Sequence, residues 1–278
     1  MEYTLNCNGR LVDLSTPQVM GILNVTPDSF YAASRTQNER EVAARVEQIV
    51  QEGGSIIDVG ACSTRPDSEP ASEQEELERL RWAMQVVRRE APDAIVSVDT
   101  FRPDVARMVV EEYGADIIND VGYPSALLTP PSSNGMFRMV SRLRVPYIFM
   151  SRKSTMKEVL LDCAEAVDTL RSMGQKDIVV DPGFGFGKTL EQNYDMMREL
   201  ERMQMLRLPV LVGVSRKSMI YRLLETTQGQ ALTGTIALNT VALEKGASLL
   251  RVHDVREAVE VVKIMAEAVP QGTGQNKQ

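Results

Sequence analysis

The chain has 278 residues, of which 43% are hydrophobic and 25% charged, a composition typical of a folded globular protein. Its net charge of −7 argues against a protein that binds nucleic acid or anionic membranes, because both need a basic surface. It shows no apolar run of the ~20 residues that span a bilayer and no signal-peptide pattern, so a cytoplasmic protein is expected. Three scattered cysteines and a single histidine indicate neither a disulfide framework nor a multi-histidine metal site.

The chain opens with a predicted β-hairpin. Residues 3–7 and 10–14 flank Asn8-Gly9, a pair that readily adopts the positive φ values of a tight turn. Short β-branched runs then alternate with amphipathic stretches. The eight strands predicted are 19–24, 55–59, 95–99, 116–119, 147–150, 177–181, 209–214 and 248–252. Helical patterns occupy 39–52, 73–90, 103–112, 156–173, 189–205 and 255–268.

Eight strands alternating with helical patterns predict a (β/α)8 TIM barrel, an α/β fold that takes about 250 residues. The nearly continuous apolar runs 178–180 and 210–214 agree, since both faces of a parallel strand are covered. An open doubly wound sheet is the alternative. The barrel is preferred because the repeat continues without a linker, so residues 1–269 should form one domain and 270–278 a disordered tail.

Polar side chains close seven of the eight predicted strands. In a barrel of this type, the residues at the carboxyl ends of the strands converge on one rim and carry the chemistry. Carboxylates and amides end the earlier strands, and cations follow the last two. The residues are Asn24, Asp58, Asp99, Asn119, Asp181, Ser215 with Lys217, and Arg251 with His253. This set would suit a ligand with an amide-like heterocycle at one end and an anion at the other.

Two stretches resemble a phosphate-binding loop and a nucleophile elbow, but neither stretch matches its motif in full. The stretch 183–189 lacks the first glycine of a phosphate-binding loop, because Pro182 stands at that position. The stretch 213–217 ends in lysine where a nucleophile elbow needs glycine. ATP hydrolysis and serine hydrolysis are therefore poor interpretations.

Seven motifs in order resemble those of dihydropteroate synthases. They are MGILNVTPDSF at 20–30, GSIIDVGACSTRP at 54–66, SVDT at 97–100, IND at 118–120, DPGFGFGK at 181–188, GVSRKS at 213–218 and LRVHDV at 250–255. One such match could arise by chance, whereas seven in family order are very specific. The resemblance implies the same barrel fold and a homodimer, and it makes a pterin pyrophosphate and p-aminobenzoate the expected substrates. It further implies that dihydropteroate and pyrophosphate are formed with Mg²⁺ in folate biosynthesis.

The resemblance also implies roles for individual residues. Pterin would be held by Asp99, Asn119, Asp181 and Lys217. Pyrophosphate would be held by Asn24, Arg251 and His253, and Asn24 would also be the protein ligand of Mg²⁺. The aminobenzoate would be framed by Thr64, Arg65, Pro66, Phe186, Ser215 and Lys217. The catalytic residues would be Asp99, Lys217, Arg251 and His253, with no protein nucleophile.

Physical chemistry agrees with these roles. A buried carboxylate accepts from ring N–H and amino groups, and an arginine binds phosphate oxygens through paired donors. Blander interpretations remain for other residues at the rim: Asp58 and Asp120 as structural groups, and Lys188 as a solvated loop cation.

The sequence departs from the family at 31–34, at Cys62 and at 149–151, which leaves the contacts of those loops open. Two alternatives also stay open. One is a pterin-dependent methyltransferase that acts on methyltetrahydrofolate, and the other is a non-catalytic paralogue. A partner made of nucleic acid or membrane is not expected.

Overall fold

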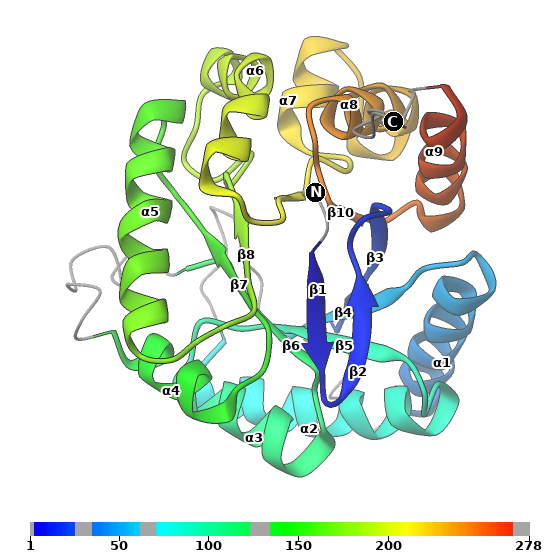
Figure 1. Ribbon diagram of the computed structural model, residues 1–278. Helices are drawn as coiled ribbons and strands as arrows, with labels where there is room; N and C mark the ends of the chain where they lie inside the picture. The colour runs from blue at the N-terminus through cyan, green and yellow to red at the C-terminus, as the bar shows by residue number, and fades with distance from the viewer. Residues whose placement is uncertain (1–2, 26–34, 62–70, 123–133, 269–278) are drawn as a thin grey trace, which may run out of the picture.

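The computed structural model describes residues 3–25, 35–61, 71–122 and 134–268, and they form a barrel surrounded by helices (Figure 1). Eight parallel strands lie in the order β8-β7-β6-β5-β4-β3-β10-β9. Their bounds are β3 Gln18–Asn24, β4 Ile56–Gly60, β5 Ile95–Asp99, β6 Ile117–Asp120, β7 Tyr147–Met150, β8 Ile178–Asp181, β9 Leu211–Val212 and β10 Leu249–Val252. The predicted barrel is confirmed, and the open doubly wound sheet is not what forms.

The barrel closes through a narrow seam between β8 and β9. A single parallel bridge joins Val180 to Val210, and the Val180 amide donates to the Pro209 carbonyl at 3.0 Å. The predicted strand 209–214 was therefore too long, since only Leu211–Val212 pairs as a ladder, with β10. Pro209 has no N–H to extend the ladder, which fits the short strand.

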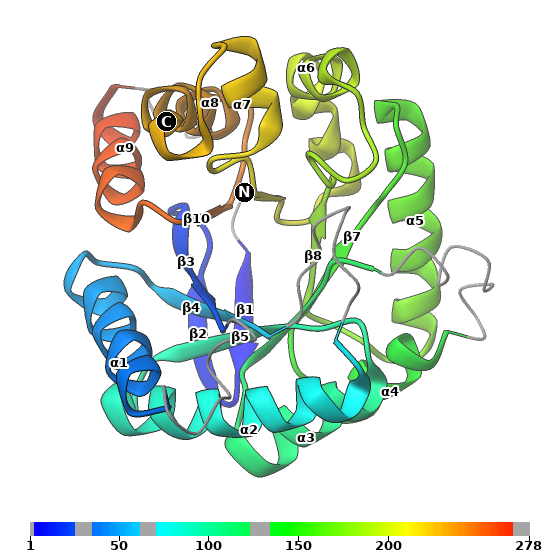
Figure 2. The same cartoon turned by 180° about the vertical axis from the view of Figure 1, so that it is seen from behind.

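Helices cover the outside of the sheet (Figure 2). They are α1 Arg35–Gln51, α2 Glu73–Glu90, α3 Pro103–Tyr113, α4 Gly135–Leu143, α5 Met156–Ser172, α6 Leu190–Arg198, α7 Ser218–Leu223, α8 Leu232–Glu244 and α9 Val255–Ala268. The predicted helix 189–205 was wrong in its second half, where α6 ends and a 3₁₀ helix, η4 Leu200–Leu206, follows. Helices α4, α7 and α8 were not predicted.

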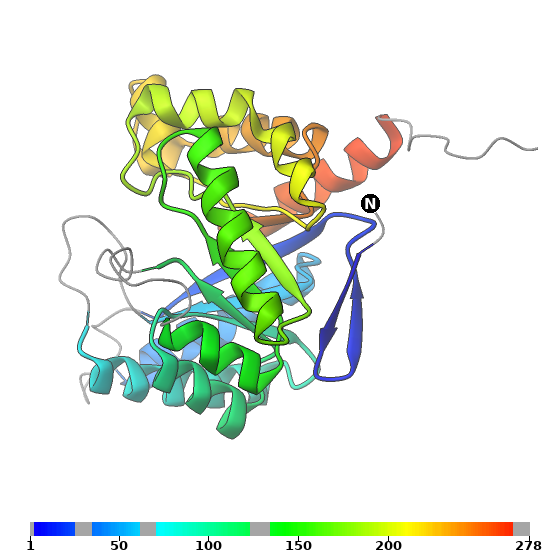
Figure 3. The same ribbon diagram turned by 60° about the vertical axis from the view of Figure 1, so that its left-hand side comes forward.

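The N-terminal hairpin, β1 Thr4–Cys7 and β2 Arg10–Asp13, lies across the amino end of the barrel (Figure 3). Its buried side chains join the apolar interior of the barrel at that end. This inner cluster contains Leu5, Cys7, Leu14, Met20, Ile56, Ile117, Ile148, Val179, Leu211 and Leu249. The amino end is thus plugged, which leaves the carboxyl ends of the strands as the open mouth. Within the described ranges, no helix combines the length and apolar character needed to cross a bilayer.

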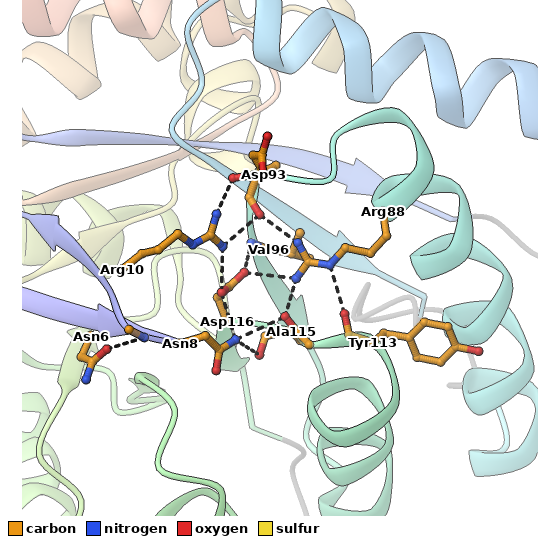
Figure 4. Close-up of polar contacts among 12 residues, drawn as sticks. Asn6, Asn8, Arg10, Arg88, Asp93, Val96, Tyr113, Ala115 and Asp116 are labelled. Carbon is orange, nitrogen blue, oxygen red and sulfur yellow. Dashed lines mark hydrogen bonds and ion pairs between the residues drawn. The ribbon is translucent and has the colours of Figure 1, made fainter.

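A buried polar cluster fixes the hairpin to the barrel (Figure 4). Asp116 is 1% exposed, and its Oδ1 accepts from Arg10 Nη2 and Asn8 Nδ2, each at 3.0 Å. Its Oδ2 accepts from the Val96 amide at 2.9 Å and from Arg88 Nη2 at 3.2 Å. Four donors thus satisfy both oxygens, as a buried carboxylate requires.

Candidate active site

One arginine and two aspartates meet inside the mouth of the barrel. Arg251, on β10, donates from Nε to Asp58 Oδ2 at 2.6 Å and from Nη2 to Asp99 Oδ2 at 2.9 Å. Asp58 lies in β4, two residues before the end of that strand, and its side chain is fully buried. Asp99 is the last residue of β5, and its side chain is 10% exposed. The strands bring these groups together although 152 and 193 residues separate Arg251 from its two partners.

Asn119, at the end of β6, joins the same network. Its Nδ2 donates to Asp58 Oδ2 at 3.2 Å, so its Oδ1 faces away from that carboxylate. This Oδ1 is buried and finds no donor within the described part of the chain. Since an unpaired buried acceptor is unfavourable, it marks a place for a ligand N–H.

Burial raises the pKa of Asp99 to about 7, and the charge of Arg251 works against this rise. The carboxylates Asp58, Glu76 and Asp120 raise it further. A ligand that brings positive charge or N–H donors would favour the ionised form of Asp99.

Asp181 is the last residue of β8, and its side chain is bonded to the loop that follows the strand. Asp181 Oδ1 accepts the Gly183 amide at 2.7 Å, and Lys188 Nζ donates to the Gly183 carbonyl at 2.7 Å. Gly183 has a φ of +72°, and a Cβ there would lie 2.1 Å from the Ser151 carbonyl oxygen, so only glycine fits. Burial raises the pKa of Asp181 and lowers that of Lys188 to about 8.

Lys217 reaches the same loop from the segment after β9. Its Nζ donates to the Phe184 carbonyl at 2.5 Å and lies 4.6 Å from the centre of the Phe186 ring. Burial lowers the pKa of Lys217 to about 8, and the charge of Asp181 opposes this shift. The Arg152 guanidinium, which follows β7, lies 5.3 Å from the same ring. Two cationic groups thus lie close to the Phe186 ring.

The last pair of the rim is Ser215 and His253. Ser215 Oγ accepts the His253 amide at 3.1 Å and lies 3.1 Å from His253 Nδ1. The Ser215 hydroxyl can donate to Nδ1, and in that tautomer Nε2–H is the remaining donor of the ring. Burial first, and the charge of Arg251 second, lower the pKa of His253 to about 4, so the ring is neutral at pH 7.

Asn24 ends β3 with an exposed side chain beside an open pocket of about 580 Å³. The pocket runs from His253 to α1, where Arg45 donates to the carbonyls of Ile22 at 3.2 Å and His253 at 2.6 Å. The described part of the chain holds no cluster of three or more His, Cys, Asp or Glu side chains placed to bind a metal ion. A Mg²⁺ ion would therefore be coordinated by the Asn24 amide oxygen, by water and by oxygens of the anion with which it binds.

Most residues predicted from strand ends do meet at this mouth. Asp99, Asn119, Asp181, Ser215, Lys217, Arg251 and His253 come from five different strands or the loops that follow them. Thr64, Arg65 and Pro66, with the departures at 31–34 and Cys62, lie outside the described residues. Asp120 is structural as interpreted, because it accepts from the Tyr147 hydroxyl at 2.6 Å and the Gly122 amide at 2.8 Å.

Sequence reasoning missed two cations that shape the site, Arg45 and Arg152. Arg45 lies in the middle of a helix, where nothing distinguishes it from solvated arginines. Arg152 stands two residues after Met150, the last residue of β7, and directly follows the segment 149–151 that departs from the family. Its position directly behind a strand end was the available signal.

The class of protein is that of the pterin-binding enzymes, as comparison with known families shows. The family model described as "Pterin binding enzyme" matches residues 20–253. The chain belongs to the dihydropteroate synthase family. It is 35% identical to the dihydropteroate synthase of Haemophilus influenzae over 94% of this chain and 97% of that protein.

Solved structures agree over nearly the whole chain. A Xanthomonas albilineans dihydropteroate synthase with 4-aminobenzoic acid superposes with a TM-score of 0.86 at 34% identity, over 97% of this chain and all of the other. The same organism's enzyme in complex with 7,8-dihydropteroate gives a TM-score of 0.82 at 32% identity, over 96% of this chain and 99% of the other.

Proposed function

We propose that this chain is a transferase that condenses 6-hydroxymethyl-7,8-dihydropterin pyrophosphate with p-aminobenzoate. The products are 7,8-dihydropteroate and pyrophosphate. Full-length relatives that are dihydropteroate synthases support this activity.

The observation that carries the proposal is the pattern of unpaired polar atoms in the mouth. Asn119 Oδ1 is an orphan acceptor, and the carboxylates of Asp99 and Asp181 add further acceptors close by. Lys217 adds a cationic donor on the other side. A dihydropterin ring presents several N–H donors together with one carbonyl acceptor, so it complements this arrangement.

The anion end of the substrate would lie toward Arg251 and His253. Arg251 commits Nε and Nη2 to carboxylates, and its Nη1 makes no hydrogen bond to the described residues. The neutral His253 ring turns Nδ1 to Ser215, and in the tautomer that accepts from the Ser215 hydroxyl it offers Nε2–H. These donors, with the Asn24 amide, suit phosphate oxygens at the open edge of the mouth.

The reaction then needs stabilisation of charge rather than a nucleophile on the protein. The bond between the pterin methylene and the pyrophosphate oxygen breaks, and the electron pair leaves with pyrophosphate. Ionised Asp99 stabilises the cationic methylene, while Arg251 and His253 stabilise the departing anion. The amine of p-aminobenzoate forms the new C–N bond and releases a proton to solvent.

The residues present fit a Mg²⁺ ion that arrives with its anion. Asn24 offers a carboxamide oxygen, which is an accepted ligand for magnesium, and the ion usually keeps several waters. When bound, Mg²⁺ would offset negative charge on pyrophosphate. The protein's own share is to present Asn24 at the edge where Arg251 and His253 receive the anion.

The aminobenzoate would enter over Phe186, next to Lys217 and Ser215. The aromatic ring of Phe186 provides an apolar face, and Lys217 places a cation close to it. Thr64, Arg65 and Pro66 belong to the same proposed subsite. A sulfonamide, which resembles p-aminobenzoate in shape, should compete there.

The test is a reaction of purified protein with the pterin pyrophosphate, p-aminobenzoate and Mg²⁺. We expect equal amounts of dihydropteroate and pyrophosphate. Methyl transfer from methyltetrahydrofolate in place of pyrophosphate release would establish the methyltransferase alternative. Tight pterin binding without any product would establish the non-catalytic one.

A homodimer and a cytoplasmic location belong to the same proposal. Leu223 and Leu224, at the end of α7, expose 54% and 52% of their surface, which agrees with a covered apolar face. Light scattering should give about twice the 30.9 kDa mass of one chain. A single-chain mass at micromolar concentration would contradict the dimer.

A further inference from the structure

We propose that Asp58 is a positioning residue that orients Arg251 and Asn119 for the pterin substrate without touching the substrate itself. The inference rests on the proposed function, because it concerns how that site is held in shape. It goes beyond the residues assigned to substrate, among which Asp58 is absent.

The first argument is that Asp58 is not accessible to a ligand. Its side chain is fully buried, and its Oδ1 accepts from Ser97 Oγ at 2.6 Å. Its Oδ2 accepts from Arg251 Nε at 2.6 Å and from Asn119 Nδ2 at 3.2 Å. All three partners are donors, so the carboxylate is enclosed by protein on both oxygens.

The second argument concerns Arg251. A guanidinium has donors in a fixed planar fork, so fixing Nε fixes the direction of the rest. With Nε on Asp58, Nη2 falls on Asp99 and Nη1 stays free of the described side chains. Without Asp58, the guanidinium could turn fully toward Asp99 and pair with it through two nitrogens. Asp58 therefore keeps one donor for the anion.

The third argument concerns Asn119. Its amide could present either its oxygen or its nitrogen to the mouth, and these alternatives reverse the hydrogen-bonding pattern. Donation from Nδ2 to Asp58 decides between them and leaves the orphan Oδ1 as the acceptor. Asp58 thus selects a ligand that brings an N–H to this position.

The neighbouring carboxylate Asp120 is a matched control. Asp120 is also buried and is the last residue of β6, but it accepts from the Tyr147 hydroxyl and the Gly122 amide. Neither partner belongs to the proposed substrate contacts. Loss of its charge should affect folding without changing the orientation of Arg251 or Asn119.

The experiment compares Asp58→Asn with wild type and Asp120→Asn, with both substrates varied in turn. The amide of Asp58→Asn places an NH₂ group against donors and removes the charge that faces Arg251. We expect kcat/KM for the pterin pyrophosphate to fall roughly 10- to 100-fold, the size associated with one lost hydrogen bond to a charged group. Rates are measured at about pH 8, where Asp99 is largely ionised, so that loss of a neighbouring carboxylate has little effect on its charge. The KM for p-aminobenzoate should stay within about twofold in Asp58→Asn, because no contact to p-aminobenzoate is removed. Asp120→Asn should keep kcat/KM for the pterin pyrophosphate and the KM for p-aminobenzoate within about twofold, because it removes no contact to either substrate.

Ser97→Ala is the milder variant should Asp58→Asn fail to fold. It leaves the charge of Asp58 and removes one hydrogen bond, so a loss of roughly 3- to 10-fold, confined to the pterin substrate, is expected. Losses shared equally by both substrates, or no larger than those of Asp120→Asn, would overturn the inference. A Ser97→Ala variant with an unchanged kcat/KM for the pterin pyrophosphate would overturn it too. Absence of turnover in wild type would instead refute the proposed function.

Discussion

A buried aspartate is paired with arginine at each end of the barrel, and the two clusters differ in how fully their polar atoms are bonded. At the amino end, both oxygens of Asp116 accept two donors each (Figure 4). At the carboxyl end, Asn119 Oδ1 lacks a donor, and Asp99 is bonded through only one oxygen within the described residues. The chemistry is the same, but one cluster is complete and the other is not.

The difference indicates where the molecule keeps its capacity to bind. A saturated cluster contributes to stability and fixes the hairpin in place, and it has nothing to offer a ligand. An unsaturated cluster pays for its open groups in stability and offers them to a substrate. The four predictions that follow test this division, from the largest expected effect to the smallest.

Removing Arg251 should have the largest effect on turnover. Arg251→Ala takes away a donor for the anion and leaves Asp58 and Asp99 without their shared cation, so kcat should fall by about 10³-fold. Matched Arg88→Ala, at the amino end, should leave kcat within about twofold. The measurement is steady-state kinetics below the melting temperature of both variants. Similar kcat losses in the two variants would erase the distinction between the ends.

Removing Asp116 should affect stability instead. Asp116→Ala leaves Arg10 and Arg88 without their shared partner and the Val96 amide without an acceptor. Because both arginines are partly exposed and can reach water, we expect about 3 kcal/mol, the low end for a broken buried pair. Urea unfolding measures this loss. A marked change in kcat for the folded variant would contradict a purely structural role.

Asp181→Asn should weaken pterin binding while the fold survives. The amide places a donor where the carboxylate accepts, which costs about 1.5–3 kcal/mol and lowers affinity at least tenfold. Calorimetry with a pterin that lacks pyrophosphate isolates this contact from the anion site. Unchanged affinity would remove Asp181 from the set of pterin ligands.

Acidification should reduce turnover through Asp99, which is faced by Arg251, Asp58, Glu76 and Asp120. Its pKa in the fold is about 7, above the 3.8 of the free side chain. Below pH 7 its charge is lost, so kcat/KM should fall about tenfold per pH unit.

In the free protein, stability should decrease as pH rises between about 4 and 7, because the folded chain then holds a proton that the unfolded chain has lost. Asp99→Asn should flatten the pH dependence of stability, and an unaltered slope would assign that dependence to another group.

Much of this division could be predicted from sequence because strand ends are local features. A polar residue that closes an apolar run can be read directly, and parallel strands bring all such residues to one rim. The pairing of Arg251 with Asp58 and Asp99 could not be predicted, because it depends on register around the barrel. The hairpin was predicted from Asn8-Gly9, but its attachment to Asp116 was not.

Two of the three helices that were missed, α7 and α8, have physical reasons. Helix α8 carries apolar residues all around, among them Leu232, Ile236, Leu238 and Val241, so no periodic face was visible. Helix α7 has only six residues, too few for a period to show. The strand at 209–214 was predicted too long because an apolar run does not reveal which of its amides find partners.

The seam between β8 and β9 has a consequence for how the barrel loosens. One bridge, Val180 to Val210, joins β8 to β9, whereas the other neighbouring strands of the barrel are joined by ladders of two to five residue pairs. Asp181 follows this bridge on one side and Lys217 lies beyond it on the other, so a pterin held by both would span the weakest joint. The bound substrate would then cross-link β8 to the segment after β9. Amide hydrogen exchange at Val180 should be the quickest among the barrel amides in the free protein, and it should slow the most when the pterin substrate binds.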